Sequence, residues 1–138
     1  IGRQVGEAAK PGDVILLVGQ LGAGKTVFTQ GVGEGLRVKE PVNSPTFVLL
    51  REYHGRLPLY HYDLYRLGNI EHTVTREWDE FLYGSGISLV EWANLAAELL
   101  PSEHLLIEFR IEAEGRRRLD MSATGQRHTD LLRSLGCS

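Results

Sequence analysis

The 138-residue chain has little cysteine and no long hydrophobic run, and each absence excludes a class of protein. Its one cysteine, Cys137, excludes an internal disulfide framework and suits a reducing compartment; we interpret it as an incidental thiol rather than a nucleophile. No segment has the layout of a signal peptide or the ~18 consecutive apolar residues that a membrane span requires. We therefore expect a cytoplasmic protein without a membrane segment.

An excess of basic charge is also lacking. Fifteen lysines and arginines stand against 18 aspartates and glutamates, for a net charge of −3, so the chain has no basic footprint for binding nucleic acid by itself. A hydrophobic content of 42% supports one core, and we expect a single domain over residues 1–138. Because the sequence begins at Ile1 rather than Met, we expect a few native residues to precede it.

The most informative segment is an apolar run, Val14–Gly19, followed directly by Gln-Leu-Gly-Ala-Gly-Lys25-Thr26. The pattern G-x-x-x-x-G-K-[ST] after a buried strand predicts a phosphate-binding P-loop. Glycines let backbone N–H groups turn toward phosphate oxygens, and the lysine supplies a cation for the terminal phosphates. Thr26 offers a hydroxyl to Mg²⁺. A glycine-rich turn that binds nothing is the competing interpretation, which this strand context disfavours.

The pattern after the P-loop predicts one mixed sheet covered by helices. Apolar residues at Phe28, Val32 and Leu36 predict a helix that stops near Gly35. Two hairpins are expected, Thr46–Tyr53 with Leu57–Asp63 and Leu105–Ile111 with Leu119–Ala123. We also expect a short strand over Ile87–Trp92 and helices over Ile70–Tyr83, Ala93–Leu100 and Arg127–Leu135.

Two carboxylates end predicted strands, and a P-loop needs an acidic partner that holds or orients Mg²⁺. Asp63 ends the strand that contains Leu59 and His61 on the same face, and Glu91 lies at the end of the next one. Both are candidates for the metal shell; the alternative for each is a solvated acid with a capping role. His61 could tune Asp63 or take part in proton transfer, or it could be purely structural.

Three further features give weaker signals. Ser44-Pro-Thr46 follows the P-loop helix, where GTPase-like proteins place a segment that senses the γ-phosphate, although such tripeptides are common in turns. Trp92 could stack on a base or pack in the core. The run Arg116–Arg118 is typical of a solvated face, but an arginine there could reach phosphate.

Taken in order, these residues make the sequence similar to the TsaE family, also called YjeE. The resemblance spans nearly the whole chain, and the combination of its motifs is far more specific than a P-loop alone. The motifs are Leu21-Gly-Ala-Gly-Lys-Thr26, Ser44-Pro-Thr-Phe47, His61-Tyr-Asp-Leu-Tyr-Arg66, Val90-Glu-Trp92, and Gly115-Arg116 with Ser122-Ala-Thr-Gly125.

This resemblance implies a P-loop NTPase-like α/β fold, a three-layer sandwich whose mixed central sheet includes both hairpins. It implies an ATPase that binds ATP or ADP with Mg²⁺ and works with the threonylcarbamoyl-transferase pair TsaD and TsaB. That complex modifies the adenosine at position 37 of tRNA, and the chain would meet tRNA only through it. The ATPase, weak alone and stimulated by its partners, would support turnover without making the threonylcarbamoyl bond.

The resemblance also assigns roles to residues of this sequence. It gives phosphate binding to the P-loop, the metal shell to Thr26, Asp63 and Glu91, and the attacking water to Asp63. It places Trp92 and, more weakly, Arg116 beside the nucleotide. The resulting catalytic set is Lys25, Asp63 and Thr46, and the nucleotide-binding set is Gly22, Ala23, Gly24, Lys25, Thr26, Val27, Trp92 and Arg116.

The sequence departs from the family pattern at two P-loop positions. Gln20 replaces the usual Asp, which removes a negative charge beside the phosphates, and Val27 replaces a common Thr or Ser, so only its backbone N–H can serve the α-phosphate. The sequence also lacks the upstream Thr-containing segment of the family, which the resemblance places beside the adenine.

Two other functions use the same loop. A small-molecule P-loop kinase would transfer the γ-phosphoryl group to an acceptor, but no clear arginine-bearing lid is present. A nucleotide-dependent adaptor would bind ATP without hydrolysing it. A GTPase is disfavoured, because the sequence has no N-K-x-D guanine reader and Asp63-Leu-Tyr-Arg66 is not D-x-x-G.

Overall fold

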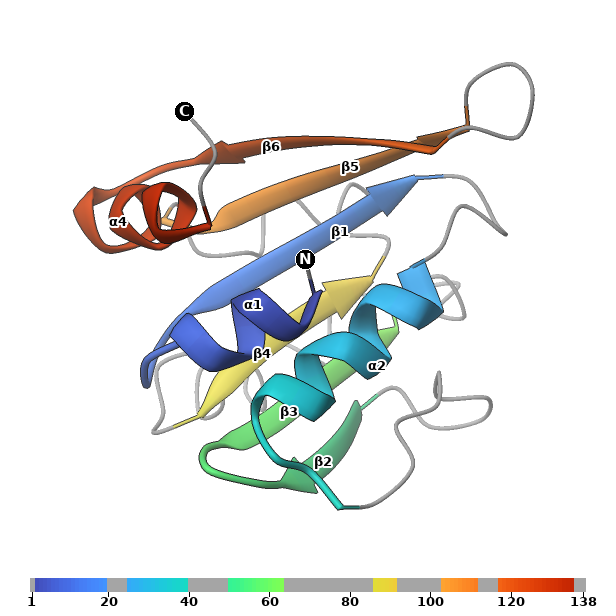
Figure 1. The fold of residues 1–138 in the computed structure, drawn as a ribbon, viewed down its shortest axis with the longest axis vertical. Helices are drawn as coiled ribbons and strands as arrows, with labels where there is room; N and C mark the ends of the chain where they lie inside the picture. The colour runs from blue at the N-terminus through green and yellow to red at the C-terminus, as the bar shows by residue number, and fades with distance from the viewer. Residues whose placement is uncertain are drawn as a thin grey trace, which may run out of the picture.

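A six-stranded mixed sheet forms the centre of the molecule (Figure 1), in the order β2-β3-β4-β1-β5-β6. The structure, a computed structural model, describes residues 2–19, 25–39, 50–63, 86–91, 103–111 and 117–135. The strands are β1 (Val14–Gly19), β2 (Leu50–His54), β3 (Pro58–Asp63), β4 (Ile87–Glu91), β5 (Leu105–Ile111) and β6 (Arg117–Ala123). The helices within these described residues are α1 (Gly2–Ala8), α2 (Lys25–Gly35) and α4 (Gln126–Ser134).

Parallel pairing sets the middle of this sheet. Strand β1 pairs in parallel with β4 on one side and β5 on the other, and β3 pairs in parallel with β4. Such strands are covered on both faces and therefore read as nearly continuous apolar runs. The run Val14-Ile-Leu-Leu-Val and the fully buried β4 follow this rule.

Antiparallel hairpins close both edges of the sheet, as the sequence predicts. Strand β2 pairs with β3, and β5 pairs with β6. The first hairpin turns at residues 55–57, and β6 begins two residues earlier than expected. Ile111 shares a face with the buried residues of β5 but is 47% exposed, because the strand extends past the core at this end.

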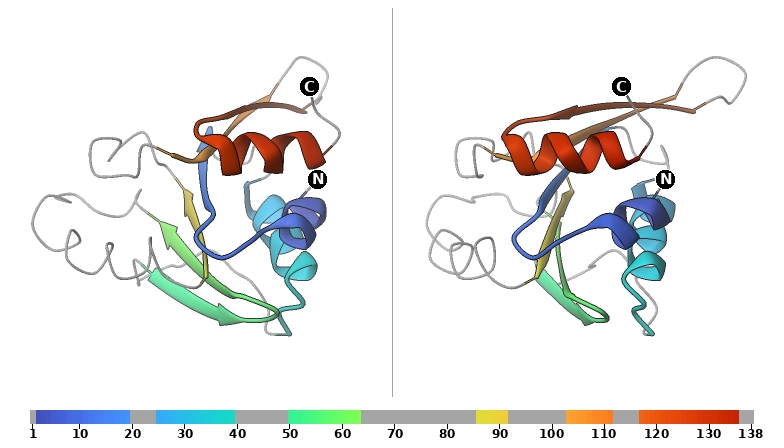
Figure 2. Two further views of the ribbon diagram at one scale, coloured as in Figure 1. Left: turned by 90° about the vertical axis from the view of Figure 1, so that its left-hand side faces the viewer. Right: turned by 60° about the vertical axis from the view of Figure 1, so that its left-hand side comes forward.

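All the described helices lie on one face of the sheet (Figure 2), where they cover the main hydrophobic core. Alternate strand residues point into this core, and the expected residues of α2 meet them there. The buried set comprises Ile15, Leu17, Tyr53, Leu59, Ile87, Leu89, Leu105, Ile107 and Phe109 from the sheet, and Val5, Ala9, Phe28, Val32, Leu36 and Leu131 from the helical side.

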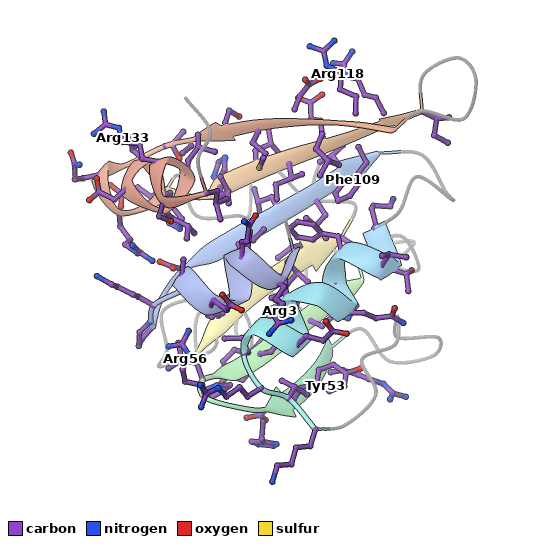
Figure 3. The ribbon with its side chains drawn as sticks, viewed as in Figure 1. Arg3, Tyr53, Arg56, Phe109, Arg118 and Arg133 are labelled. Carbon is purple, nitrogen blue, oxygen red and sulfur yellow. The ribbon has the colours of Figure 1, made fainter. Side chains whose placement is uncertain are left out.

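The short helix α1, which the sequence analysis did not predict, packs against α2 through glycines. A methyl group at Gly6 would overlap the carbonyl oxygen of Val32 and come within 2.9 Å of the Gly35 Cα atom. The two backbones can approach this closely only without side chains between them. Arg56 fixes the end of the helix, since its Nη2 donates to the carbonyls of Gly6 at 2.9 Å and Ala9 at 3.0 Å (Figure 3).

Helix α4 is fastened to the segment between α1 and β1. The Arg127 guanidinium donates to both carboxylate oxygens of Asp13, at 2.9 and 2.8 Å, and to the Ala8 carbonyl at 3.0 Å. His128 is buried beside it, and its Nε2 accepts the Val14 backbone N–H at 3.0 Å. Leu131 and the partly buried Leu135 pack on the core, and the helix expected at this end of the chain is confirmed.

Two expected helices, Ile70–Tyr83 and Ala93–Leu100, lie outside the described residues. Within the part of the chain that the structure describes, no helix is long and apolar enough to cross a membrane.

Candidate nucleotide-binding site

Three strand ends meet the start of α2 at one edge of the sheet. Strands β1, β3 and β4 end there at Gly19, Asp63 and Glu91, and α2 begins at the same edge (Figure 1). The register aligns Glu91 with Leu17 on one side and with Asp63 on the other. Ligands of open α/β sheets bind outside the carboxyl ends of the strands, so this edge is the candidate site.

Gly19 and Lys25 mark the two ends of the predicted P-loop. The Lys25 side chain is only 6% exposed, and its Nζ donates to the Gly19 carbonyl at 2.8 Å. Gly19 has φ 152° and lies against β5, where a Cβ atom would come within 2.6 Å of the Phe109 carbonyl oxygen. The loop therefore needs glycine at this position for a reason of space as well as conformation.

An aromatic contact holds α2 against the sheet beside this loop. The rings of Phe28 and Phe109 meet edge to face, with centroids 5.5 Å apart and an interplanar angle of 81°. Phe109 projects from β5 toward the start of α2 (Figure 3). Edge-to-face aromatic pairs contribute about 0.5–1.5 kcal/mol beyond the area that they bury. The position of Lys25 is thus supported by packing three residues further along the helix.

Glu91 is the carboxylate that the structure places against the P-loop helix. It is 4% exposed, and its Oε1 lies 3.2 Å from His61 Nε2 and 3.4 Å from Thr29 Oγ1. Thr29 Oγ1 also donates to the Lys25 carbonyl at 2.8 Å. Glu91, at the end of β4, therefore contacts a buried polar side chain of β3, His61, and a buried polar side chain of α2, Thr29.

Two predicted P-loop residues follow Lys25 on the first turn of α2. Thr26 is exposed, and the Val27 side chain is 66% exposed. Both positions turn away from the core that Phe28 and Val32 enter. An exposed valine at position 27 is consistent with a contribution from its backbone alone.

The opposite face of β3 carries no comparable acidic site within the described residues. Tyr60 and Tyr62 are buried there, as the alternation of the strand predicts. Burial raises the pKa of the Tyr62 phenol well above its ordinary value, with a nearby Ser88 side chain acting in the other direction. The phenol therefore stays protonated at neutral pH.

Several predicted site residues lie outside the described part of the chain. For Asp63, the structure describes only the backbone position at the end of β3. Arg118, from the basic run, is exposed, and its Nε donates to Asp120 Oδ1 at 2.7 Å. The predicted residues that lie outside are Gly22, Ala23, Gly24, Thr46, Trp92 and Arg116, together with Gln20.

Comparison with protein families shows which family this chain belongs to. The family model described as "Threonylcarbamoyl adenosine biosynthesis protein TsaE" matches residues 1–119. The chain belongs to the TsaE family. This assignment covers the P-loop, the first hairpin, β4 and β5, whereas α4 lies beyond the matched residues.

Individual TsaE relatives match most of the chain. The tRNA threonylcarbamoyladenosine biosynthesis protein TsaE of Bacillus subtilis is 46% identical over 128 residues, which are 92% of this chain and 80% of the relative. The protein of the same description from Treponema pallidum is 41% identical over 121 residues, 88% of this chain and 90% of the relative. The resemblance inferred from the motifs is confirmed.

A solved structure confirms the predicted fold class. The crystal structure of YdiB from Bacillus subtilis superimposes with a TM-score of 0.79 at 40% identity, covering 98% of this chain and 84% of that one. The two chains therefore share one α/β fold.

Two residues at this TsaE site have roles that the sequence analysis did not assign. Thr29 was not considered, although its spacing of four from Lys25 places the two on one side of a helix. His61 was considered beside Asp63, and the structure places it against Glu91 instead. That contact depends on β3 lying beside β4, which the local pattern of neither strand shows.

Proposed function

We propose that this chain is a Mg²⁺-dependent ATPase of tRNA threonylcarbamoyladenosine biosynthesis. The main support is the convergence of Lys25 and Glu91, both nearly buried, at the carboxyl edge of a parallel sheet where the P-loop sequence begins. Membership of the TsaE family supports the pathway, because its relatives are described as tRNA threonylcarbamoyladenosine biosynthesis proteins. ATP and ADP are the proposed nucleotides.

The P-loop and Lys25 would bind the phosphates. Lys25 Nζ donates to the Gly19 carbonyl, and it would exchange that neutral acceptor for charged phosphate oxygens when nucleotide enters. Hydrogen bonds to charged groups are stronger than bonds to neutral carbonyls, so the exchange favours binding. Backbone N–H groups of residues 22–27 would supply the remaining donors.

The donor set at this edge fits magnesium. Mg²⁺ takes one or two protein carboxylates, with the remaining ligands coming from phosphates and water. Glu91 is a buried carboxylate with no lysine or arginine partner among the described residues, and Thr26 lies in the first turn of α2. The described residues contain no group of three or more His, Cys, Asp or Glu side chains that could hold a metal ion.

In this proposal, Thr26 and Glu91 would hold the ion, and Asp63 would lie by it or orient the attacking water. Bound Mg²⁺ would supply positive charge for the phosphates during hydrolysis. Thr46 would belong to the loop that responds to the γ-phosphate, and Trp92 and Arg116 would border the nucleotide. Hydrolysis would support turnover of the TsaD and TsaB transferase complex, through which the chain would meet tRNA.

Nucleotide binding tests this proposal directly. We expect calorimetric titration to show binding of ATP and ADP that weakens when EDTA removes Mg²⁺. Lys25→Ala removes a charged donor and should weaken binding by about 10-fold or more. The matched control is Lys10→Ala, because Lys10 is an exposed lysine before β1, at the other end of the sheet, and it bonds Asp13 through its backbone N–H and carbonyl, which the substitution keeps. Equal affinities in the two variants would contradict the P-loop assignment.

A further inference from the structure

His61 is a buried polar residue that ordinary packing does not explain. Its side chain has 0% exposure and shares a face of the sheet with Leu59 and Leu89, which belong to the hydrophobic core. Burying an imidazole without hydrogen bonds is costly, and buried polar groups normally have partners. Neither ring nitrogen makes a well-aligned hydrogen bond within the described structure, yet Nε2 lies 3.2 Å from Glu91 Oε1.

The hydrogen-bonding capacity of the groups around the Glu91 carboxylate points to His61 as its hydrogen-bond donor. Ionised Glu91 can only accept hydrogen bonds. Thr29 has one hydroxyl hydrogen, and its 2.8 Å bond to the Lys25 carbonyl is much shorter than the 3.4 Å contact with Glu91 Oε1. His61 Nε2 is the nearer donor atom, and a proton there avoids a clash between nitrogen and oxygen lone pairs. A hydrogen on Nε2 therefore fits this contact better than a hydrogen on Nδ1 does.

Both contacts are made with the same oxygen of the carboxylate. Oε1 faces His61 and Thr29, while Oε2 makes no hydrogen bond within the described part of the chain. A carboxylate held at one oxygen keeps its orientation when the other oxygen binds a cation. Residues that orient metal ligands in this way typically change metal affinity by about 10–100-fold when they are replaced.

We infer that His61 is a positioning residue for Glu91: its Nε2–H holds Oε1, so that the carboxylate stays directed at the metal ion beside the nucleotide. This inference rests on the proposed function, since it assumes that Glu91 serves Mg²⁺. His61 itself stays behind the carboxylate, because Mg²⁺ prefers oxygen ligands to imidazole.

Two variants separate positioning from simple packing. The amide nitrogen of His61→Gln takes roughly the place of Nε2, whereas the amide of His61→Asn reaches only about as far as Nδ1. Mn²⁺ replaces Mg²⁺ as the probe, and its affinity for the protein–ADP complex is measured by electron paramagnetic resonance. We expect His61→Gln to stay within about 3-fold of the original chain and His61→Asn to weaken Mn²⁺ binding about 10-fold or more. ADP affinity in EDTA should be the same in all three proteins.

The outcomes distinguish this inference from the proposed function. Equal Mn²⁺ affinities in the two variants would overturn the positioning role while leaving the proposed function intact. Failure of the unaltered chain to bind Mn²⁺ with ADP would overturn the proposed function, and the inference with it.

A measurement on the unaltered chain covers the case in which His61→Asn does not fold. With ¹⁵N-labelled histidine, the Nε2–H signal of His61, assigned by its loss in His61→Gln, should be present and should shift when Mg²⁺ and ADP are added. A proton on Nδ1 alone, or a signal that Mg²⁺ and ADP leave unchanged, would overturn the inference.

Discussion

Buried polar side chains make the specific connections in this molecule. Glu91 connects β4 to β3 and α2 through His61 and Thr29, and Asp13 connects the start of β1 to α4 through Arg127. Each carboxylate is nearly inaccessible, so each needs charged or hydrogen-bonding neighbours to offset the loss of water. These positions therefore tolerate substitution less well than the exposed acids of the same chain.

His128 should make the stability of the fold depend on pH. Burial lowers the pKa of its imidazole below the ordinary value; Asp13 acts in the other direction, and Arg127 and His104 reinforce the lowering. The unfolded chain therefore takes up the proton at a higher pH than the folded chain does. The neutral His128 imidazole therefore makes its full contribution to the stability of the fold above about pH 6.5. This contribution is lost as the pH falls through the lower pKa of His128 in the folded state.

Comparison with His128→Gln isolates this effect. Glutamine keeps an acceptor for the Val14 N–H, but it does not titrate. Urea unfolding between about pH 7.5 and 5 should show a steeper loss of unfolding free energy in the original chain than in the variant. If the unfolding free energy fell equally steeply in the original chain and in His128→Gln, the role assigned to His128 would be contradicted.

Among the elements, α1 depends most on its neighbours. It has seven residues, including Gly2 and Gly6, and a helix this short is not stable alone. Contact with α2 and the Arg56 donors at its C-terminal end hold it in place. The local sequence pattern could not predict α1, because two glycines in seven residues argue against a helix.

Gly6→Ala tests the close approach of α1 and α2. The added methyl group would overlap the Val32 carbonyl oxygen, so the two helices must separate. We expect the free energy of unfolding to fall by about 1–3 kcal/mol. Gln4→Ala, on the exposed face of the same helix, should change it by no more than about 0.5 kcal/mol. Thermal or urea denaturation measures both, and equal stability of the two variants would show that the helices are not in tight contact.

Other elements could be predicted because their local signals were strong. The apolar run of β1, the spacing of Phe28, Val32 and Leu36, and the alternation of β5 each correspond to an observed element. The observed ends of strands can differ from the predicted ends by one or two residues, as at the start of β6. Fraying and strand pairing decide where a strand ends, and composition does not.

At the scale of the whole molecule, the decisive fact is the strand order. The P-loop strand β1 lies between β4 and β5, and β3 lies on the far side of β4. Sequence motifs indicated that Lys25 and Glu91 act together, but not that β3 of the first hairpin lies directly beside the strand of Glu91. The contact of His61 with Glu91 follows from this non-local pairing, so it could only be found in the folded structure.

The central claim is that this TsaE-family chain hydrolyses ATP in support of the TsaD and TsaB complex. The most direct measurement is Mg²⁺-dependent release of free phosphate from ATP, by the chain alone and with purified TsaB and TsaD. We expect slow release alone, a clear increase with the partners, and a loss of about 10-fold or more in Glu91→Gln. Glu52→Gln, an exposed acid on β2, should match the original chain. Background release with the partners present, or phosphate appearing on a small-molecule acceptor instead, would contradict the claim in favour of an adaptor or a kinase.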